Sequence, residues 1–181
     1  MSGRIANIIV IILEAIGLSV SISDRKWKIF AYYTQISNLL TIVSSIVYVL
    51  FPQAAFSGLL RYLSSCMLTM TFLVTLFVLV PMGGGFKNLM LSGNGLYHHT
   101  LCPVISVLSY IFLEAHVPVW YLPPVITLVY GITMMYMNHI EKFDGPYPFF
   151  RVNHQSAAAT VLWIIILFGV ISVISLLLGA V

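Results

Sequence analysis

Charged residues are scarce in this chain of 181 residues, and their scarcity excludes most soluble folds. Asp, Glu, Lys and Arg make up 7% of the sequence, whereas 60% of it is hydrophobic. A soluble domain of this length would carry roughly 25% charged residues. The mean hydropathy of +1.03 agrees with this contrast. The composition therefore predicts an integral membrane protein before any motif is considered.

Cysteine and net charge are also low. The two cysteines, Cys66 and Cys102, both fall in apolar segments, which predicts small core residues rather than a disulfide framework. The net charge is only +3, and the basic residues are scattered along the chain, so we expect no nucleic-acid partner. The run GGG at 83–85 is not followed by the Gly-Lys-Ser/Thr of a phosphate loop, and we expect a flexible connection there.

Long apolar runs make up most of the remaining sequence. A membrane-spanning helix needs about 20 mostly apolar residues, whereas the strands of a spanning barrel alternate with a period of two. The runs here are continuous, which favours helices. Six segments qualify, at 5–22, 29–51, 59–81, 96–115, 119–140 and 157–180. We therefore predict one all-α integral membrane domain over 1–181, a bundle of about six transmembrane helices with short loops.

Six spans would place both termini on one side of the membrane. The segment 5–22 carries Glu14 and no cleavage site follows it, so we expect a retained first helix. The loops after the first, third and fifth spans then share the other side. Those loops hold six basic residues, Arg25, Lys26, Lys28, Lys87, Lys142 and Arg151, against Arg4 and Arg61 opposite. The positive-inside rule predicts that these loops are cytoplasmic.

Polar residues gather at one predicted depth, on the side of those three loops. Thr34 lies about five residues into the second span, which is about 8 Å below its start at the rise of an α-helix. His98 and His99 lie less than one turn into the fourth span, which enters from the same side. Asn138 and His139 close the fifth span there. These residues are therefore candidates for one site.

The stretch YYTQISNLL at 32–40 is unusually polar for a membrane helix. Its Thr34 and Asn38, with Thr41 and Ser45, fall at spacings of four, three and four, so they share one helix face. Packing explains such residues, because small and hydroxylated side chains let membrane helices approach. The functional alternative is that Thr34 faces a cavity. A hydroxyl is a weak nucleophile that needs a neighbouring base, and histidine is the natural one.

The two histidines cannot both face one substrate, because adjacent helical residues point about 100° apart. His98 shares a side with Cys102, and His99 shares one with Pro103. This geometry does not decide between them. Candidate groups for orienting the base are Glu14, Asn38, Asn138 and a tyrosine hydroxyl.

Two other functions fit the same polar residues. A small transporter or a lipid-binding protein would use them as a substrate pathway. A zinc-dependent hydrolase would use them as ligands, but the chain has no His-x3-His pair or similar helical ligand spacing. The zinc candidates are His98 or His99, His139, His154 and one of Glu14, Glu141 and Asp144.

The turn DGPYPFF at 144–150 follows the fifth span. Its Tyr147, Phe149 and Phe150 would either anchor at the membrane interface or line the mouth of a lipid-binding cavity.

Three short signatures in order resemble the androgen-induced and androgen-dependent family of multipass membrane proteins and its bacterial Pr6Pr-type relatives. The first signature is an aromatic residue, then Thr, then Asn four residues after it. The second is a His followed by Thr and Pro, and the third is Tyr-Pro-Phe. They correspond here to Tyr32, Thr34, Asn38 and Leu39, to HHTLCP at 98–103, and to Tyr147, Pro148 and Phe149.

The resemblance covers nearly the whole chain and implies a function. The eukaryotic members are threonine hydrolases that cleave fatty acid esters of hydroxy fatty acids. By this resemblance Thr34 is the nucleophile, and the protein hydrolyses a fatty-acyl ester in the bilayer without a cofactor. Alignment on Pro103 to the eukaryotic pattern favours His98 as the base, whereas the bacterial pattern favours His99. Asn38, Glu14, Asn138, His139 and Tyr147 are the candidate supporting residues.

Overall fold

The computed structural model describes residues 2–143 and 147–181, without the side chains of 24–28. Helices account for all the regular structure in this part of the chain, which contains no strand. The long helices are α1 (Ser2–Arg25), α2 (Tyr33–Leu50), α3 (Ala55–Val74), α6 (Cys102–Leu113), α7 (Leu122–His139) and α8 (Ala157–Gly179). The shorter elements are η1 (Lys26–Ala31), η2 (Thr75–Gly84), α4 (Phe86–Met90), α5 (Gly93–Gly95), η3 (Leu96–Leu101), η4 (Pro148–Phe150) and η5 (Val152–His154).

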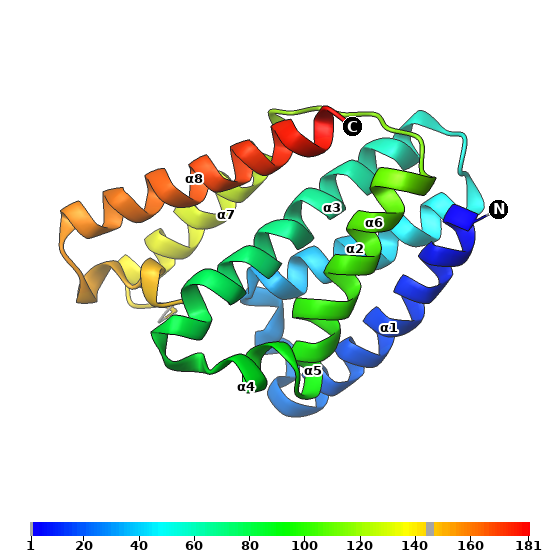
Figure 1. The fold of residues 1–181 in the computed structure, drawn as a ribbon. Coiled ribbons are helices and arrows are strands. Elements are labelled where there is room, and N and C mark those ends of the chain that lie inside the picture. Colours follow the sequence, from blue (N-terminus) through cyan, green and yellow to red (C-terminus); the bar gives the residue numbers. More distant parts are fainter. Residues whose placement is uncertain (1, 144–146) are drawn as a thin grey trace.

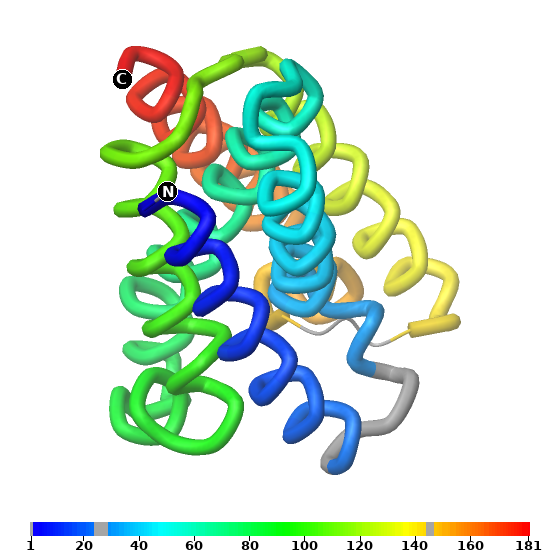
Figure 2. Tube along the Cα trace, turned by 90° about the vertical axis from the view of Figure 1, so that its right-hand side faces the viewer, coloured from blue at the N-terminus to red at the C-terminus, as the bar shows by residue number. Residues whose placement is uncertain are grey.

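The helix α3 is at the centre of the bundle. Helices α1, α2, α3 and α6 pack around one another, and the antiparallel pair α7 and α8 packs on the other side of α3 (Figure 1). Both ends of the chain lie at one end of the bundle, as the two views show (Figures 1 and 2). The short elements α4, α5 and η1 lie at the opposite end, and this is where the candidate site forms.

The predicted fold class is confirmed. Five helical stretches are long and apolar enough to cross a membrane: Ser2–Ser23, Tyr33–Leu50, Ala55–Gly84, Gly93–Leu113 and Ala157–Gly179. The helix α7 forms where the remaining span was expected, but it is not among these five. Large apolar side chains cover the outside of the bundle, including Phe77 and Phe112, which are 69% and 73% exposed. Such a surface is suited to lipid rather than water.

The second span begins later than predicted. A 3-10 helix, η1, occupies the start of the expected segment, and α2 begins at Tyr33. Thr34 is therefore the second residue of a helix, and the prediction that it lies about five residues into the second span was wrong. Tertiary contacts explain the break, because Tyr130 donates its hydroxyl hydrogen to the Ala31 carbonyl at 2.8 Å, and Tyr147 accepts the Thr34 N–H. The Ala31 carbonyl and the Thr34 N–H, which the break leaves without helical partners, are therefore both hydrogen-bonded.

The third span is longer than predicted. It begins at Ala55 rather than at residue 59, and α3 runs on through the π-helical η2 to Gly84. The glycine-rich segment then turns sharply, with Gly83 at φ 104° and Gly85 at φ 70°, a region that glycine adopts without strain. The segment after these glycines folds into α4 and α5.

The fourth span begins with a π-helical turn, η3, which carries both histidines. Pro103 lies just after it and has no N–H to donate to the carbonyl four residues earlier. The N–H of Cys102 donates to the carbonyl of Tyr97, five residues earlier. Turns of this kind change the direction of side chains, and they are frequent at functional sites.

A fully buried ion pair links α3 and the C-terminal end of α6. Arg61 Nε donates to Glu114 Oε2 at 2.8 Å, and both side chains have no solvent exposure. Arg61 also donates to Ser44, Ser45, Ser64 and Ser106, while Asn7 and Ser109 donate to Glu114. We call these residues the Arg61 cluster. Since Arg61 is a core residue, counting it as a loop charge in the topology argument was wrong.

Candidate active site

Thr34 lies in the first turn of α2, where backbone N–H groups lack helical partners. Its own N–H donates to the Tyr147 hydroxyl at 3.2 Å. Its Oγ1 lies 3.1 Å from the same hydroxyl, in a hydrogen bond that either group can donate. Burial raises the pKa of the Tyr147 phenol, against the opposing effect of the Thr34 hydrogen bonds. Tyr147 is therefore protonated at neutral pH and is able to donate to the Thr34 hydroxyl.

Thr34 borders a cavity of about 360 Å³, which we call the polar cavity. His99 and Tyr147 share its wall with Thr34, so the structure brings together the candidate nucleophile and one candidate base. The other residues that line it are Ser21, Ile29, Tyr32, Gln35, Leu79, Asn88, Leu89, Asn94 and Gly95. This wall combines amide and hydroxyl groups with apolar side chains, which suits a ligand that has both a polar group and a hydrocarbon part.

The ring of His99 is oriented by the end of α4. Its Nδ1 lies 2.7 Å from the carbonyl oxygen of Leu89. A carbonyl only accepts, so Nδ1 carries the proton and Nε2 is the basic nitrogen of the neutral ring. The next residue, Thr100, donates to the carbonyl of Met90 at 2.6 Å. Both bonds use carbonyls at the C-terminal end of α4, which lack helical partners.

His98 is in a different environment. It is fully buried, with Nε2 3.4 Å from Glu14 Oε2 and Nδ1 3.1 Å from Gln35 Nε2. A Cβ added at Gly17 would lie 2.5 Å from His98 Nε2, so this glycine makes room for the ring. The prediction that Glu14 reaches the histidines is confirmed for His98, and this is the histidine that does not line the polar cavity.

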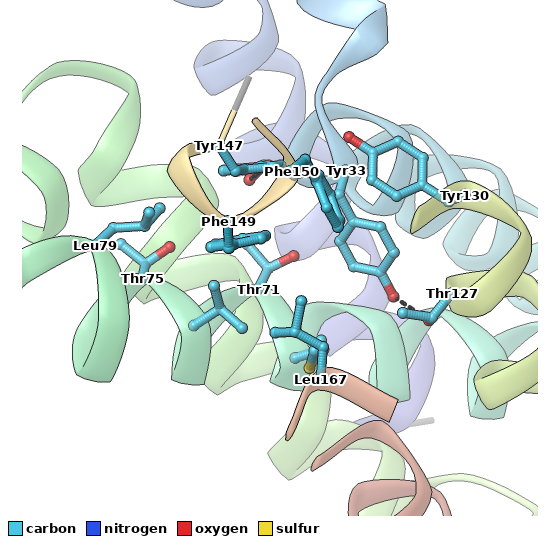
Figure 3. A pocket seen from close by; sticks show the side chains of 13 residues that line it. Tyr33, Thr71, Thr75, Leu79, Thr127, Tyr130, Tyr147, Phe149, Phe150 and Leu167 are labelled. Carbon is cyan, nitrogen blue, oxygen red and sulfur yellow. Dashed lines mark hydrogen bonds between the residues drawn. The ribbon is translucent and has the colours of Figure 1, made fainter. Parts of the chain in front are cut away.

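Thr34 also borders an apolar pocket on its other side, with a volume of about 40 Å³. Figure 3 shows the rings of Tyr147, Phe149 and Phe150 along this pocket, with Leu167 and Thr127 beyond them. Tyr33 closes one wall through a 2.7 Å hydrogen bond between its hydroxyl and Thr127. Thr34 and Tyr147 therefore lie between a polar cavity and an apolar pocket.

The Tyr-Pro-Phe segment packs into the bundle. Tyr147, Phe149 and Phe150 are all buried, and the rings of Tyr147 and Phe149 stack with centroids 5.2 Å apart. Phe149 also contacts Trp163 of α8. Of the two roles predicted for these aromatics, their burial along the apolar pocket favours the lining of a cavity over interfacial anchoring, and lipid binding there stays a prediction. Residues 144–146 of the same turn, including Asp144, lie outside the described residues.

The remaining predicted residues lie elsewhere. Asn38 is buried, and neither its amide nitrogen nor its oxygen has a partner in the described part of the chain. Asn138 accepts from the backbone of Asn153 and lines a separate cavity of about 180 Å³ with Glu141 and His154. His139 is exposed at the end of α7. Neither Asn138 nor His139 borders the polar cavity.

The zinc alternative finds no ligand set in the described residues. No group of three or more His, Cys, Asp and Glu side chains lies close enough together there to hold a metal ion. Cys66 and Cys102 are both buried and free, as the sequence predicted.

Several residues of the site were not predicted from the sequence. Asn88, Leu89 and Asn94 come from the segment after the GGG run, to which no function was assigned, and Gln35 had no predicted role. Gln35 donates both to Ser21 and to His98, so it joins α1, α2 and η3. The one available signal was the amide side chains within the glycine-rich segment.

Comparisons of the chain with known protein families, with curated proteins and with solved structures find no match. A hydroxyl, an imidazole and a phenol border one cavity, and a hydroxyl beside an imidazole is the combination used in acyl transfer.

Proposed function

We propose that the protein is a membrane-embedded hydrolase of lipid esters, with Thr34 as nucleophile and His99 as general base. The observation that carries this proposal is the position of Thr34, which shares a polar cavity with His99 and also borders an apolar pocket. An ester of a fatty acid has the matching shape, because a polar carbonyl joins a hydrocarbon chain. The resemblance to threonine hydrolases of fatty acid esters supports Thr34 as the nucleophile, and its bacterial pattern favours His99 as the base.

The first step is acyl transfer to Thr34. His99 Nε2 takes the proton of the Thr34 hydroxyl while Oγ1 attacks the carbonyl carbon of the ester. The tetrahedral intermediate collapses when the bond to the alcohol oxygen breaks, and His99 returns its proton to that oxygen. The products of this step are the free alcohol and an acyl ester of Thr34.

The second step restores the enzyme. Water in the polar cavity gives a proton to His99 and attacks the acyl carbonyl. The bond to Thr34 Oγ1 then breaks, Oγ1 takes the proton back, and the fatty acid leaves. The Leu89 carbonyl holds His99 in one tautomer throughout, because it always accepts from Nδ1.

Negative charge on the carbonyl oxygen needs hydrogen-bond donors in each step. Tyr147 is the first candidate, since its hydroxyl already contacts Thr34 Oγ1 and its raised pKa keeps it protonated. The amides of Asn88 and Asn94 also line the cavity. The N-terminal end of α2 adds a favourable partial positive charge at Thr34.

His99 is preferred to His98 for two reasons. It borders the cavity, whereas His98 is enclosed between Glu14 and Gln35. Its basic nitrogen is also defined by the Leu89 carbonyl. His98 is then a structural residue that holds η3 against α1.

A fluorophosphonate probe tests the nucleophile directly. We expect the purified protein in detergent to be labelled, the Thr34→Ala variant to lose labelling, and Thr34→Ser to keep it. Thr71→Ala is the matched control, because Thr71 also borders the apolar pocket but its hydroxyl bonds to Ser37. Full labelling of a folded Thr34→Ala variant would contradict the proposal. A wild-type protein that binds fatty acids but is never labelled would favour a lipid-binding function instead.

A further inference from the structure

The apolar pocket beside Thr34 adjoins a second cavity that lies nearer the outer surface of the bundle. This cavity, of about 30 Å³, lies between α7 and α8 and is separated from the pocket by the side chains that both share, Thr127, Phe150 and Leu167. Its outer wall includes Ile132 and Phe168, which are 54% and 42% exposed. Two adjoining apolar cavities, divided by shared side chains, therefore lie between Thr34 and the surface where α7 and α8 would meet lipid.

Gly131 of α7 lies beside Phe150, one of these shared side chains. It is buried, it lines the second cavity, and a Cβ added to it would lie 3.6 Å from the Phe150 ring, an ordinary van der Waals contact. Alanine therefore fits at this position. A larger side chain would extend into the space between α7 and α8.

We infer that the acyl chain of the substrate enters from the bilayer between α7 and α8, through a portal formed by Gly131, Phe150 and Leu167. The inference rests on the proposed function and adds the class of acyl group. The occupant is an unbranched aliphatic chain whose carboxyl end reaches Thr34, while the alcohol part of the ester lies in the polar cavity. The chain never has to leave an apolar environment on this route.

The portal is narrow in this structure. Its two cavities have volumes of about 40 and 30 Å³, against about 360 Å³ for the polar cavity. An acyl chain must therefore displace side chains as it enters. Met70 and Met135 line the two cavities, and methionine repacks easily because it is unbranched and flexible. A slender chain displaces least, so branched chains are disfavoured.

Hydrolysis of p-nitrophenyl esters of different chain lengths tests the portal. We expect the wild-type protein in detergent to prefer the dodecanoyl ester to the butyryl ester. Gly131→Leu fills the portal and should lower the ratio of the dodecanoyl to the butyryl rate by about tenfold or more. Gly131→Ala should leave this ratio unchanged, because its methyl group fits.

Gly169→Leu is the matched control. Gly169 lies on α8, and an added Cβ there has nothing within 4 Å. The same substitution should therefore leave the chain-length ratio at the wild-type value. Leu167→Ala provides a test in the opposite direction that does not depend on Gly131→Leu folding. By widening the portal, it should raise the rate on a branched acyl ester relative to the straight-chain ester.

The two proposals fail in different ways. If Gly131→Leu slows both esters equally and Leu167→Ala leaves the branched ester unchanged, the portal is overturned while the hydrolase stands. If the wild-type protein hydrolyses neither ester faster than Thr34→Ala does, the hydrolase is overturned, and the portal with it. A selective loss on the long ester, restricted to Gly131→Leu, supports both.

Discussion

The Arg61 cluster and the polar residues around Thr34 are both buried, but they differ in how completely they are hydrogen-bonded. Each side-chain nitrogen of Arg61 donates, and both carboxylate oxygens of Glu114 accept. On α2, the amide of Asn38 and the Oε1 of Gln35 have no hydrogen-bond partner among the described residues. The buried charges of the Arg61 cluster are fully paired, and within that cluster only Asn7 Oδ1 lacks a partner among the described residues, whereas Gln35 keeps an unpaired oxygen and borders the polar cavity.

This difference distinguishes polar residues that stabilise the fold from polar residues that are available to a substrate. A buried polar group without a partner is costly, so a folded bundle usually satisfies such groups internally. The Arg61–Glu114 ion pair does so, and its cluster joins α1, α2, α3 and α6. Gln35, beside Thr34, retains an oxygen that a substrate or water in the polar cavity can satisfy, as membrane proteins do at functional sites. Buried polar groups that lack hydrogen-bond partners, rather than polarity alone, therefore indicate which region is the candidate site.

The largest expected effect is on stability, in the Arg61 cluster. Glu114→Gln leaves the Arg61 charge without its counterion and should lower the free energy of unfolding by about 3–5 kcal/mol. Thermal unfolding in detergent micelles measures this change. The double variant Arg61→Met with Glu114→Leu removes both charges and should recover much of the loss. A single variant as stable as the wild type would remove the distinction between the two regions.

The next effect is on catalysis, at His99. Asparagine at this position keeps an N–H for the Leu89 carbonyl but has no basic nitrogen, so His99→Asn should slow ester hydrolysis by about 10²- to 10⁴-fold. Its midpoint of thermal unfolding should change little. His98→Asn should show the opposite pattern, with lower stability because its ring fills the space between Glu14 and Gln35. A reversal of these two results would identify His98 as the base.

A smaller effect is expected at Tyr147. Tyr147→Phe keeps the ring stack with Phe149 and removes the hydroxyl that bonds Thr34, so labelling by the fluorophosphonate should slow by about 10- to 100-fold. Because burial raises the pKa of Tyr147 above its ordinary value of 10.0, the phenol stays neutral as pH rises to about 9. A fall in the wild-type rate below pH 9 that Tyr147→Phe abolishes would show an ionising phenol and contradict this role.

The smallest effect is expected at Asn38. Leucine has a similar shape, and Asn38→Leu removes a buried amide without partners, so the protein should gain about 1 kcal/mol of stability. Thr41→Val offers a comparison, since the Thr41 hydroxyl already bonds to the Ser37 carbonyl, and no gain is expected there. A loss of stability in Asn38→Leu would mean that this amide is satisfied in the folded protein after all.

The fold class follows from sequence because the membrane imposes it. Long apolar runs with few charges form spanning helices, since lipid provides no partners for backbone groups. The helix ends were harder to predict. No proline or glycine marks the break before Tyr33, and it depends on the hydroxyls of Tyr130 and Tyr147, which arrive from later parts of the chain. A pattern within one segment cannot show such contacts.

The candidate site was predictable in part, because polar residues are conspicuous within an apolar sequence. Thr34 stands out because a polar stretch in an apolar helix is unusual, and the two histidines stand out at the start of another span. The choice between those histidines depends on how η3 turns and on where the end of α4 lies. Leu89 gives no sequence signal, because its backbone carbonyl orients His99 and any residue type carries that group.

The sequence by itself determined that this is an α-helical membrane bundle with its unusual polar residues near Thr34 and His99. Only the tertiary structure decided which of those residues share a cavity, which are saturated, and that Arg61 is a core residue paired with Glu114. The physical reason is that hydropathy acts on each segment separately. Hydrogen bonding between buried side chains depends on distances between segments, and the packing of the whole bundle sets those distances.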